Sequence, residues 1–228
     1  MKSNQPTVAL TMGDPAGVGP EIIAGAWQRS GFLDVSRPVV LGHPEILRRA
    51  VRLCQGHAEV VEIDRVAKAS PSERVIPCLR CGSDDALEVE AGRIDARSGE
   101  AAYEAVVAAA RLALAGEVDA ITTAPLHKEA LHLAGHHYPG HTELLAELCG
   151  VDDFAMMLYL GAGDPIASSG GLAVVHVTLH TALANVFAEL TADAVLAKAR
   201  LADRFMNRLN GTRPRIGVCS LNPHGGEG

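Results

Sequence analysis

Short apolar runs alternate with longer segments of helical periodicity along most of the 228-residue chain. Runs rich in β-branched residues predict buried strands, whereas apolar positions recurring every three to four residues predict helices. We predict strands at residues 7–11, 38–42, 60–63, 74–77, 119–123, 155–160, 172–178 and 214–220. We predict helices from residue 20 and over 44–54, 98–115, 142–149 and 191–209. This alternation predicts an α/β fold with a mainly parallel sheet and helices on both faces.

Residues typical of helix ends support several of these boundaries. Pro20 stands at a first helical position, where its missing N–H leaves no hydrogen bond unmade. Thr191 is typical of an N-cap, and Gly116 and Gly211 stand where helices commonly stop. Ligands of open parallel sheets bind beyond the carboxyl ends of strands. We therefore expect a site among the loops that follow Thr11, Thr123, Thr178 and Ser220.

Composition excludes several classes of function. Lys and Arg number 20 against 27 Asp and Glu, no basic cluster exceeds a pair, and aromatic residues are only 4%, so nucleic-acid binding is not expected. The most apolar stretch, 105–115, contains Arg111 and is far shorter than the roughly 20 residues of a membrane span. The N-terminus lacks the apolar core of a signal peptide, and five cysteines are an odd number, so we expect a reduced, cytoplasmic protein.

Four histidines stand where a parallel sheet would place a site. His141 precedes a predicted helix, His176 and His180 lie near the end of the strand at 172–178, and His224 follows the last predicted strand. Imidazoles that converge from strand ends suit a divalent metal. For His176 we favour a hydrogen-bonded core histidine, and the six other histidines have no comparable context.

Three further motifs are open to two interpretations. The glycine-rich segment Gly13–Glu21 is equally a tight turn or a loop that approaches a ligand, and it lacks the spacing of a dinucleotide fingerprint. Lys128 could pair with an anion, but a solvated lysine at a helix start is favoured. Cys78 and Cys81 form a single C-x-x-C pair without a second ligand pair, and we interpret them as ordinary thiols.

The last residues differ from the end expected of a compact α/β domain. A glycine-rich loop, Gly225–Gly228, follows the last predicted strand after four intervening residues, and loops of this kind usually lead into a helix. We therefore expect the sequence to be part of a longer polypeptide.

Taken together, the motifs resemble those of the 4-hydroxythreonine-4-phosphate dehydrogenase family. The matching segments appear in the family's order and span the whole chain; they are Met12–Ile22, Ile121–Leu131, Tyr138–Ala146, Val174–Leu183 and Leu221–Gly228. The stretch from Thr123 to Ala146 is most similar to the branch that acts on D-threonate or D-erythronate 4-phosphate.

The resemblance implies a fold, a domain division and site residues. The implied fold is an α/β/α sandwich of the isocitrate and isopropylmalate dehydrogenase type, with two domains flanking a cleft. Residues 1–138 would belong to the first domain, completed by a segment not in this sequence, and 139–228 to part of the second. His141 and Thr142 would contact substrate, and His180 and His224 would bind a divalent metal. A third metal-binding histidine and phosphate-binding residues of the family have no counterpart in this sequence.

The implied reaction is the metal-dependent oxidation and decarboxylation of a 4-phosphorylated hydroxy acid by NAD or NADP. The substrate would be 4-phosphohydroxy-L-threonine or D-threonate or D-erythronate 4-phosphate, and the metal Zn, Mg, Mn or Co. A cation on the reacting oxygen would stabilise the charge that forms during both steps. The resemblance also implies a homodimer with shared active sites. The alternatives are a phosphate acyltransferase-like enzyme on a related fold, or an inactive fragment.

Overall fold

The structure, a computed structural model, describes residues 5–29, 31–221 and 224. The chain forms two compact units, Met1–Gly150 and Val151–Gly228, and each is described by itself. The predicted domains 1–138 and 139–228 refer to a protein completed by further segments, and this division stays a prediction.

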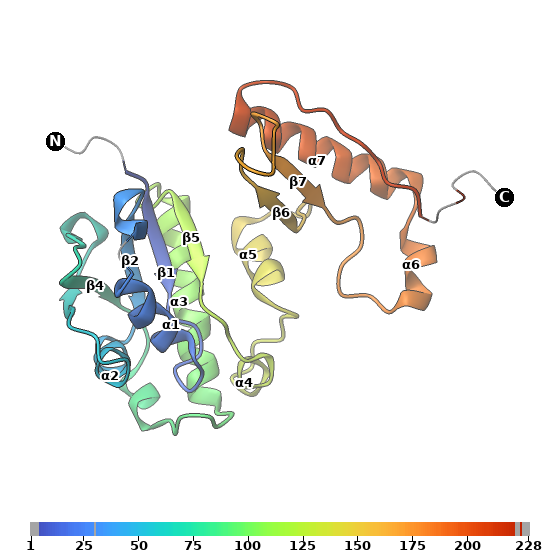
Figure 1. Cartoon of the computed structure of the whole chain (residues 1–228). Helices are drawn as coiled ribbons and strands as arrows, with labels where there is room; N and C mark the ends of the chain where they lie inside the picture. Colours follow the sequence, from blue (N-terminus) through green and yellow to red (C-terminus); the bar gives the residue numbers. More distant parts are fainter. Residues whose placement is uncertain (1–4, 30, 222–223, 225–228) are drawn as a thin grey trace. The chain divides into compact units, whose positions relative to one another are not determined.

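A parallel sheet forms the centre of the first unit (Figure 1). Its strand order is β3-β4-β2-β1-β5, and every pairing is parallel. The strands are β1 Thr7–Thr11, β2 Arg37–Gly42, β3 Glu59–Ile63, β4 Val75–Arg80 and β5 Ala120–Thr123. All of them agree with the predicted strands to within a few residues. The inner strands β1, β2 and β4 are apolar and largely buried, whereas the edge strands β3 and β5 are more exposed.

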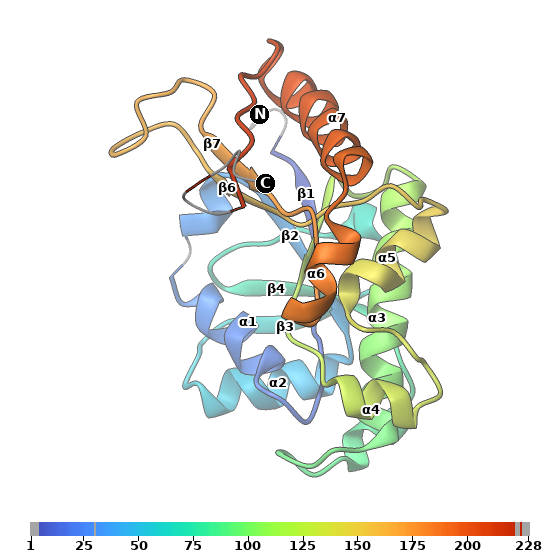
Figure 2. The same cartoon turned by 90° about the vertical axis from the view of Figure 1, so that its right-hand side faces the viewer.

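Helices cover both faces of this sheet, as Figures 1 and 2 show. Successive residues of β2 face opposite sides of the sheet and therefore contact different helices. Val40 packs with α1 (Gly19–Trp27) and α2 (Pro44–Leu53), whereas its neighbours Val39 and Leu41 pack with α3 (Ala96–Leu114). The predicted α/β class, with helices on both faces of a parallel sheet, is therefore confirmed.

The remaining helices of this unit are short. Three 3₁₀ turns, Gly31–Asp34, Val66–Lys68 and Asp84–Glu88, connect larger elements. Two helices follow β5, namely α4 (Lys128–Leu133) and α5 (His141–Cys149). The loops that lead into them stand at the carboxyl edge of the sheet, where the sequence predicts a site.

The second unit pairs β6 (Met157–Leu160) with β7 (Leu172–Val175) in an antiparallel hairpin. It also contains α6 (Leu183–Glu189) and α7 (Ala192–Asn210). The predicted ends of α7 are confirmed. The Thr191 hydroxyl accepts a hydrogen bond from the Ala194 N–H at 3.1 Å, and Gly211 adopts the left-handed conformation.

Two predictions in this unit are wrong. The residues 214–220 form no strand, because no described strand pairs with them and a strand needs a neighbour to satisfy its backbone. The strand predicted at 172–178 ends at Val175, so His176 lies just beyond it and is only half-buried rather than in a core.

None of the described helices is both long enough and apolar enough to cross a bilayer.

Candidate functional site

Two loops meet at the carboxyl edge of the central sheet. From β1 the chain passes to β2 on one side, and β5 later pairs with β1 on the other side. In open α/β sheets, ligands usually bind beyond the carboxyl ends of the strands at such a reversal of strand order. The Asp14 N–H, after β1, donates to the Pro125 carbonyl, after β5, at 3.0 Å. The structure thus joins two loops that lie far apart in the sequence.

The β1–α1 loop is a tight turn closed by its own polar groups. Asp14 is buried, and its carboxylate accepts a hydrogen bond from the Ala16 N–H at 2.7 Å. The Asp14 carbonyl accepts from the Gly17 N–H at 3.0 Å. Of the two interpretations of this segment, the tight turn is the one that these contacts favour.

His141 is the first residue of α5, and its imidazole is half-buried. Its Nε2 atom is buried without a hydrogen-bond partner. Burial lowers the pKa of His141, and a hydrogen bond with the backbone of Ala124 opposes that shift in part. The ring therefore favours the neutral form, which offers one nitrogen to a ligand. A buried polar atom without a partner is uncommon in native proteins, and a bound ligand is one of the physical explanations for it.

Thr142 follows His141 in the first turn of α5 and is also half-buried. The first N–H groups of a helix lack intrahelical acceptors, and the helix dipole favours an anion beside them. The two residues predicted to contact substrate thus stand together at one helix start, beside the β5–α4 loop. Their contact with substrate stays a prediction.

The predicted metal ligands lie in the second unit. His180 is exposed and adopts a φ of +52°, a conformation uncommon for a side-chain-bearing residue. His224 is exposed as well. Within the described ranges, no group of three or more His, Cys, Asp and Glu side chains is placed to hold a metal ion. The assignment of His180 and His224 as ligands stays a prediction.

His176, predicted to be a satisfied core histidine, is neither in the core nor fully hydrogen-bonded. Its backbone N–H donates to the Met156 carbonyl at 3.2 Å, but its Nδ1 atom is buried without a partner.

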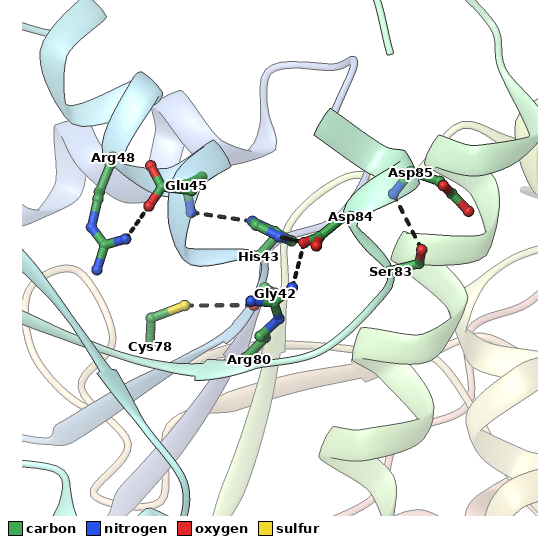
Figure 3. A network of polar contacts seen from close by, with 9 residues as sticks. All are labelled: Gly42, His43, Glu45, Arg48, Cys78, Arg80, Ser83, Asp84 and Asp85. Carbon is green, nitrogen blue, oxygen red and sulfur yellow. Dashed lines mark hydrogen bonds and ion pairs between the residues drawn. The ribbon is translucent and has the colours of Figure 1, made fainter. Parts of the chain in front are cut away.

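Sequence reasoning missed His43, which the structure buries at the carboxyl end of β2 (Figure 3). Its Nδ1 atom accepts a hydrogen bond from the Glu45 N–H at 3.2 Å, and its Nε2 atom lies 2.8 Å from the Asp84 carboxylate. Arg80 also binds Asp84, and both partners hold the pKa of that carboxyl below its usual value. The sequence could have indicated this position, because His43 directly follows a predicted strand and precedes Pro44, where a helix is predicted to start.

The remaining candidates have ordinary surroundings. Lys128 is an exposed first residue of α4, in agreement with the favoured interpretation. Cys78 and Cys81 are free thiols, and burial raises the pKa of both, to about 11 for Cys81. A raised thiol pKa opposes metal binding and redox reactivity, because both require the thiolate.

The sequence profile of the family described as "Pyridoxal phosphate biosynthetic protein PdxA" matches residues 34–228. The chain belongs to the PdxA family. The resemblance inferred from the motifs is confirmed.

PdxA relatives match nearly the whole of this chain. It is 44% identical over 230 residues to the 4-hydroxythreonine-4-phosphate dehydrogenase of Trichlorobacter lovleyi, covering 100% of this chain and 66% of the relative. It is 43% identical over 222 residues to the D-threonate 4-phosphate dehydrogenase of Salmonella typhimurium, covering 97% and 65%. A crystal structure of 4-hydroxythreonine-4-phosphate dehydrogenase from Klebsiella pneumoniae superposes with a TM-score of 0.86 at 42% identity, again covering 97% and 65%. The chain therefore spans about two thirds of the length of these PdxA proteins.

Proposed function

We propose that this chain is part of a nicotinamide-dependent dehydrogenase that oxidises a 4-phosphorylated hydroxy acid. Similarity along the whole chain to PdxA proteins with dehydrogenase names supports the reaction class. The observation from this chain that carries the proposal is the half-buried imidazole of His141 at a helix start, whose Nε2 atom is buried without a hydrogen-bond partner.

The proposed reaction consumes a secondary alcohol and an oxidised nicotinamide. The carbon hydride passes to NAD or NADP, and the hydroxyl proton is released, so that a ketone forms. Because this ketone lies beta to a carboxylate, the product can then lose carbon dioxide and leave a phosphorylated ketone. The nicotinamide supplies the hydride chemistry, and the protein supplies position and electrostatics.

Within this reaction, His141 and Thr142 would hold the substrate. The neutral imidazole of His141 can accept a hydrogen bond from a substrate hydroxyl or donate one to a phosphate oxygen. Thr142 can offer its hydroxyl to the same substrate, and the first turn of α5 adds N–H donors suited to an anion.

A divalent metal is the second cofactor of the proposal, with His180 and His224 among its ligands. Imidazole nitrogen suits Zn or Co, and Mg and Mn less well because these two prefer oxygen ligands, so the donor chemistry fits a divalent metal. The number of donors does not, because the described residues include no group of three ligands. The proposal therefore requires a further ligand from outside this set, and the metal, when bound, would act as a Lewis acid toward the substrate oxygen.

A homodimer in the cytoplasm completes the proposal. All five cysteines are free, as expected of a reducing compartment. On one face of the β6–β7 hairpin, four aliphatic side chains are 49–60% exposed: Leu158, Leu160, Leu172 and Val174. A second copy of the chain would remove such a face from water. Sedimentation of the protein with Leu160→Glu tests this, since a dimer that uses the face should dissociate.

The test of the reaction is a dehydrogenase assay on a full-length polypeptide that contains this chain. Reduced nicotinamide is followed by absorbance with NAD and with NADP, using each of the three phosphorylated hydroxy acids. We expect turnover that a chelator removes and a divalent metal restores. We expect His141→Ala to lower kcat/KM by about 100-fold, as for loss of a group that orients the reacting atoms.

Two matched variants distinguish loss of metal binding from loss of the folded structure. His180→Ala should abolish turnover and leave the far-UV circular dichroism unchanged. His57→Ala, which removes an exposed imidazole at the opposite edge of the sheet, should leave turnover unchanged. Near-normal activity of His180→Ala with added metal would show that the ligand assignment is wrong.

The rival reactions have their own readouts. Transfer of the acyl group from acyl phosphate to the thiol of coenzyme A, with release of inorganic phosphate and without reduction of nicotinamide, would support the acyltransferase alternative. For the 228-residue chain alone we expect no turnover, because the metal ligands are incomplete. Robust reduction of NAD by this chain would contradict that expectation.

A further inference from the structure

Gly13 lies so close to the β5–α4 loop that no side chain fits between them. A Cβ atom built on Gly13 would lie 2.3 Å from the Pro125 carbonyl oxygen and 2.9 Å from that of Ala124. Real Cβ atoms essentially never approach an oxygen this closely. The φ of Gly13 is +71°, which also favours glycine. Any larger residue must therefore displace the β5–α4 loop.

Asp14 holds the β1–α1 loop in the shape that permits this approach. Its backbone N–H donates to the Pro125 carbonyl, and its carboxylate accepts from the Ala16 N–H. The opposite side of the loop is held as well, because the Gly92 N–H donates to the Ala16 carbonyl at 2.8 Å. The loop is thus bound on both sides and has little freedom to absorb a shift.

The β5–α4 loop in turn lies against His141. Ala124 is hydrogen-bonded to Thr11 through its N–H, at 3.1 Å, and its backbone also bonds to the His141 imidazole. The position of Ala124 and Pro125 therefore decides where this ring lies and where its unpartnered Nε2 atom points.

We infer that Gly13 and Asp14 are positioning residues, which set the place of the His141 imidazole through Ala124 and Pro125. The importance of this position for substrate rests on the proposed function, whereas the positioning itself is a property of this chain alone. The two can therefore be tested separately.

The first test measures the His141 ring by NMR in the 228-residue chain. Its signals are assigned by their loss in His141→Gln, and their shifts are followed against pH. Gly13→Ala should displace the ring signals and the titration midpoint. Gly116→Ala is the matched control, because Gly116 has nearly the same φ, +73°, but no atom within 4 Å of an added Cβ. This control should leave the His141 ring signals and the titration midpoint unchanged, although it introduces the same backbone strain.

A second pair of variants keeps the test decisive if Gly13→Ala does not fold. Asp14→Ala removes the acceptor for the Ala16 N–H, so the His141 signals and titration should move. Asp14→Asn retains an oxygen acceptor at that place, so it should restore them. If folded Gly13→Ala or Asp14→Ala protein titrates at His141 as the unchanged chain does, the inference is overturned.

The last measurement links the inference to turnover in the full-length polypeptide. Misplacement of a binding group by about 1 Å can cost on the order of 100-fold in rate. We expect kcat/KM to fall between about 10-fold and 100-fold in Asp14→Ala and to recover in Asp14→Asn. If the ring signals move but the protein has no dehydrogenase activity, the positioning stands and the proposed function fails.

Discussion

At the scale of single residues, burial separates four of the five thiols of this chain into two pairs. Cys149 and Cys219 are exposed, whereas Cys78 is buried in the central sheet and Cys81 is partly buried. A pKa of about 11 leaves Cys81 with about 100-fold less thiolate at neutral pH than an ordinary cysteine, and the raised pKa of Cys78 acts in the same direction.

We predict that iodoacetamide alkylates Cys149 and Cys219 in the folded protein and leaves Cys78 and Cys81 unmodified over the same time. Peptide mass spectrometry measures the extent at each site. In denaturant, all of these thiols should react at similar rates. Modification of Cys78 in the folded protein would contradict its burial and reopen a redox role for the C-x-x-C pair.

Glu104 has a carboxylate oxygen that is buried without a hydrogen-bond partner. Burial raises the pKa of Glu104, the neighbouring Glu100 raises it further, and His136 lowers it in part. The folded state therefore holds this proton more tightly than the unfolded state does. Its contribution to stability is complete below the ordinary pKa of glutamate and is lost as the pH rises through the raised value.

We predict that Glu104→Gln weakens this loss of stability above the ordinary pKa of glutamate. The gain in the free energy of unfolding at neutral pH should be modest, below about 1 kcal/mol, because solvent screens a partly exposed carboxyl. Urea unfolding at a series of pH values measures it. Glu117→Gln, at an exposed glutamate, should leave the pH dependence unchanged. An identical pH dependence in Glu104→Gln would show that the carboxyl is not destabilised.

At the scale of elements, two helical glycines with opposite surroundings show what packing adds to propensity. Gly99 lies where α3 meets α4, and a Cβ atom there would be 2.0 Å from the Ala130 carbonyl oxygen. Gly25, within α1, has no atom within 4 Å of an added Cβ. Helix propensity alone favours alanine at both positions.

We predict opposite effects of the two alanine substitutions on the free energy of unfolding. Gly99→Ala must push α4 away from α3 and should destabilise the protein by about 1–3 kcal/mol. Gly25→Ala should stabilise it by about 0.5–1 kcal/mol, because only backbone entropy changes. Denaturant unfolding of both variants provides the measurement. A gain of stability in Gly99→Ala would show that the contact between α3 and α4 is looser than the structure has it.

At the scale of the whole molecule, the two units differ in how much they bury. Both core clusters lie within the first unit, between Ala9 and Ala124. Among the described residues of the second unit, Met206 alone is buried. The helices α3 and α7 illustrate this, since both have 19 residues but α3 buries eight and α7 only Met206.

We predict that amide hydrogen exchange is much slower in α3 than in α7. Protection follows the free energy of opening, which depends on buried apolar contacts more than on helix length. Exchange followed by mass spectrometry on the 228-residue chain tests this, and the equal lengths of the two helices make each a control for the other. Equal protection would show that the second unit has a stable core of its own.

Most of the longer elements of this fold could be predicted from sequence because their signals are local. Periodicity located every strand of the central sheet, and Thr191 and Gly211 marked the ends of α7 correctly. The ordered motifs identified the family, since they span the chain. His141 and Thr142 could be named from their motif and position before a helix, but the unpartnered state of Nε2 could not.

What the tertiary structure decided depends on partners that are distant along the chain. Asp84 binds His43 from 41 residues away, and Pro125 meets Gly13 across an even longer separation. The residues 214–220 have the composition of a strand, but no described neighbour pairs with them. Local sequence sets what a segment prefers, whereas burial and pairing are set by which distant segments fill the space around it. For that reason the strands of the central sheet and the family were determined by the sequence, whereas the pairing of segments and the surroundings of each polar side chain were determined by the fold.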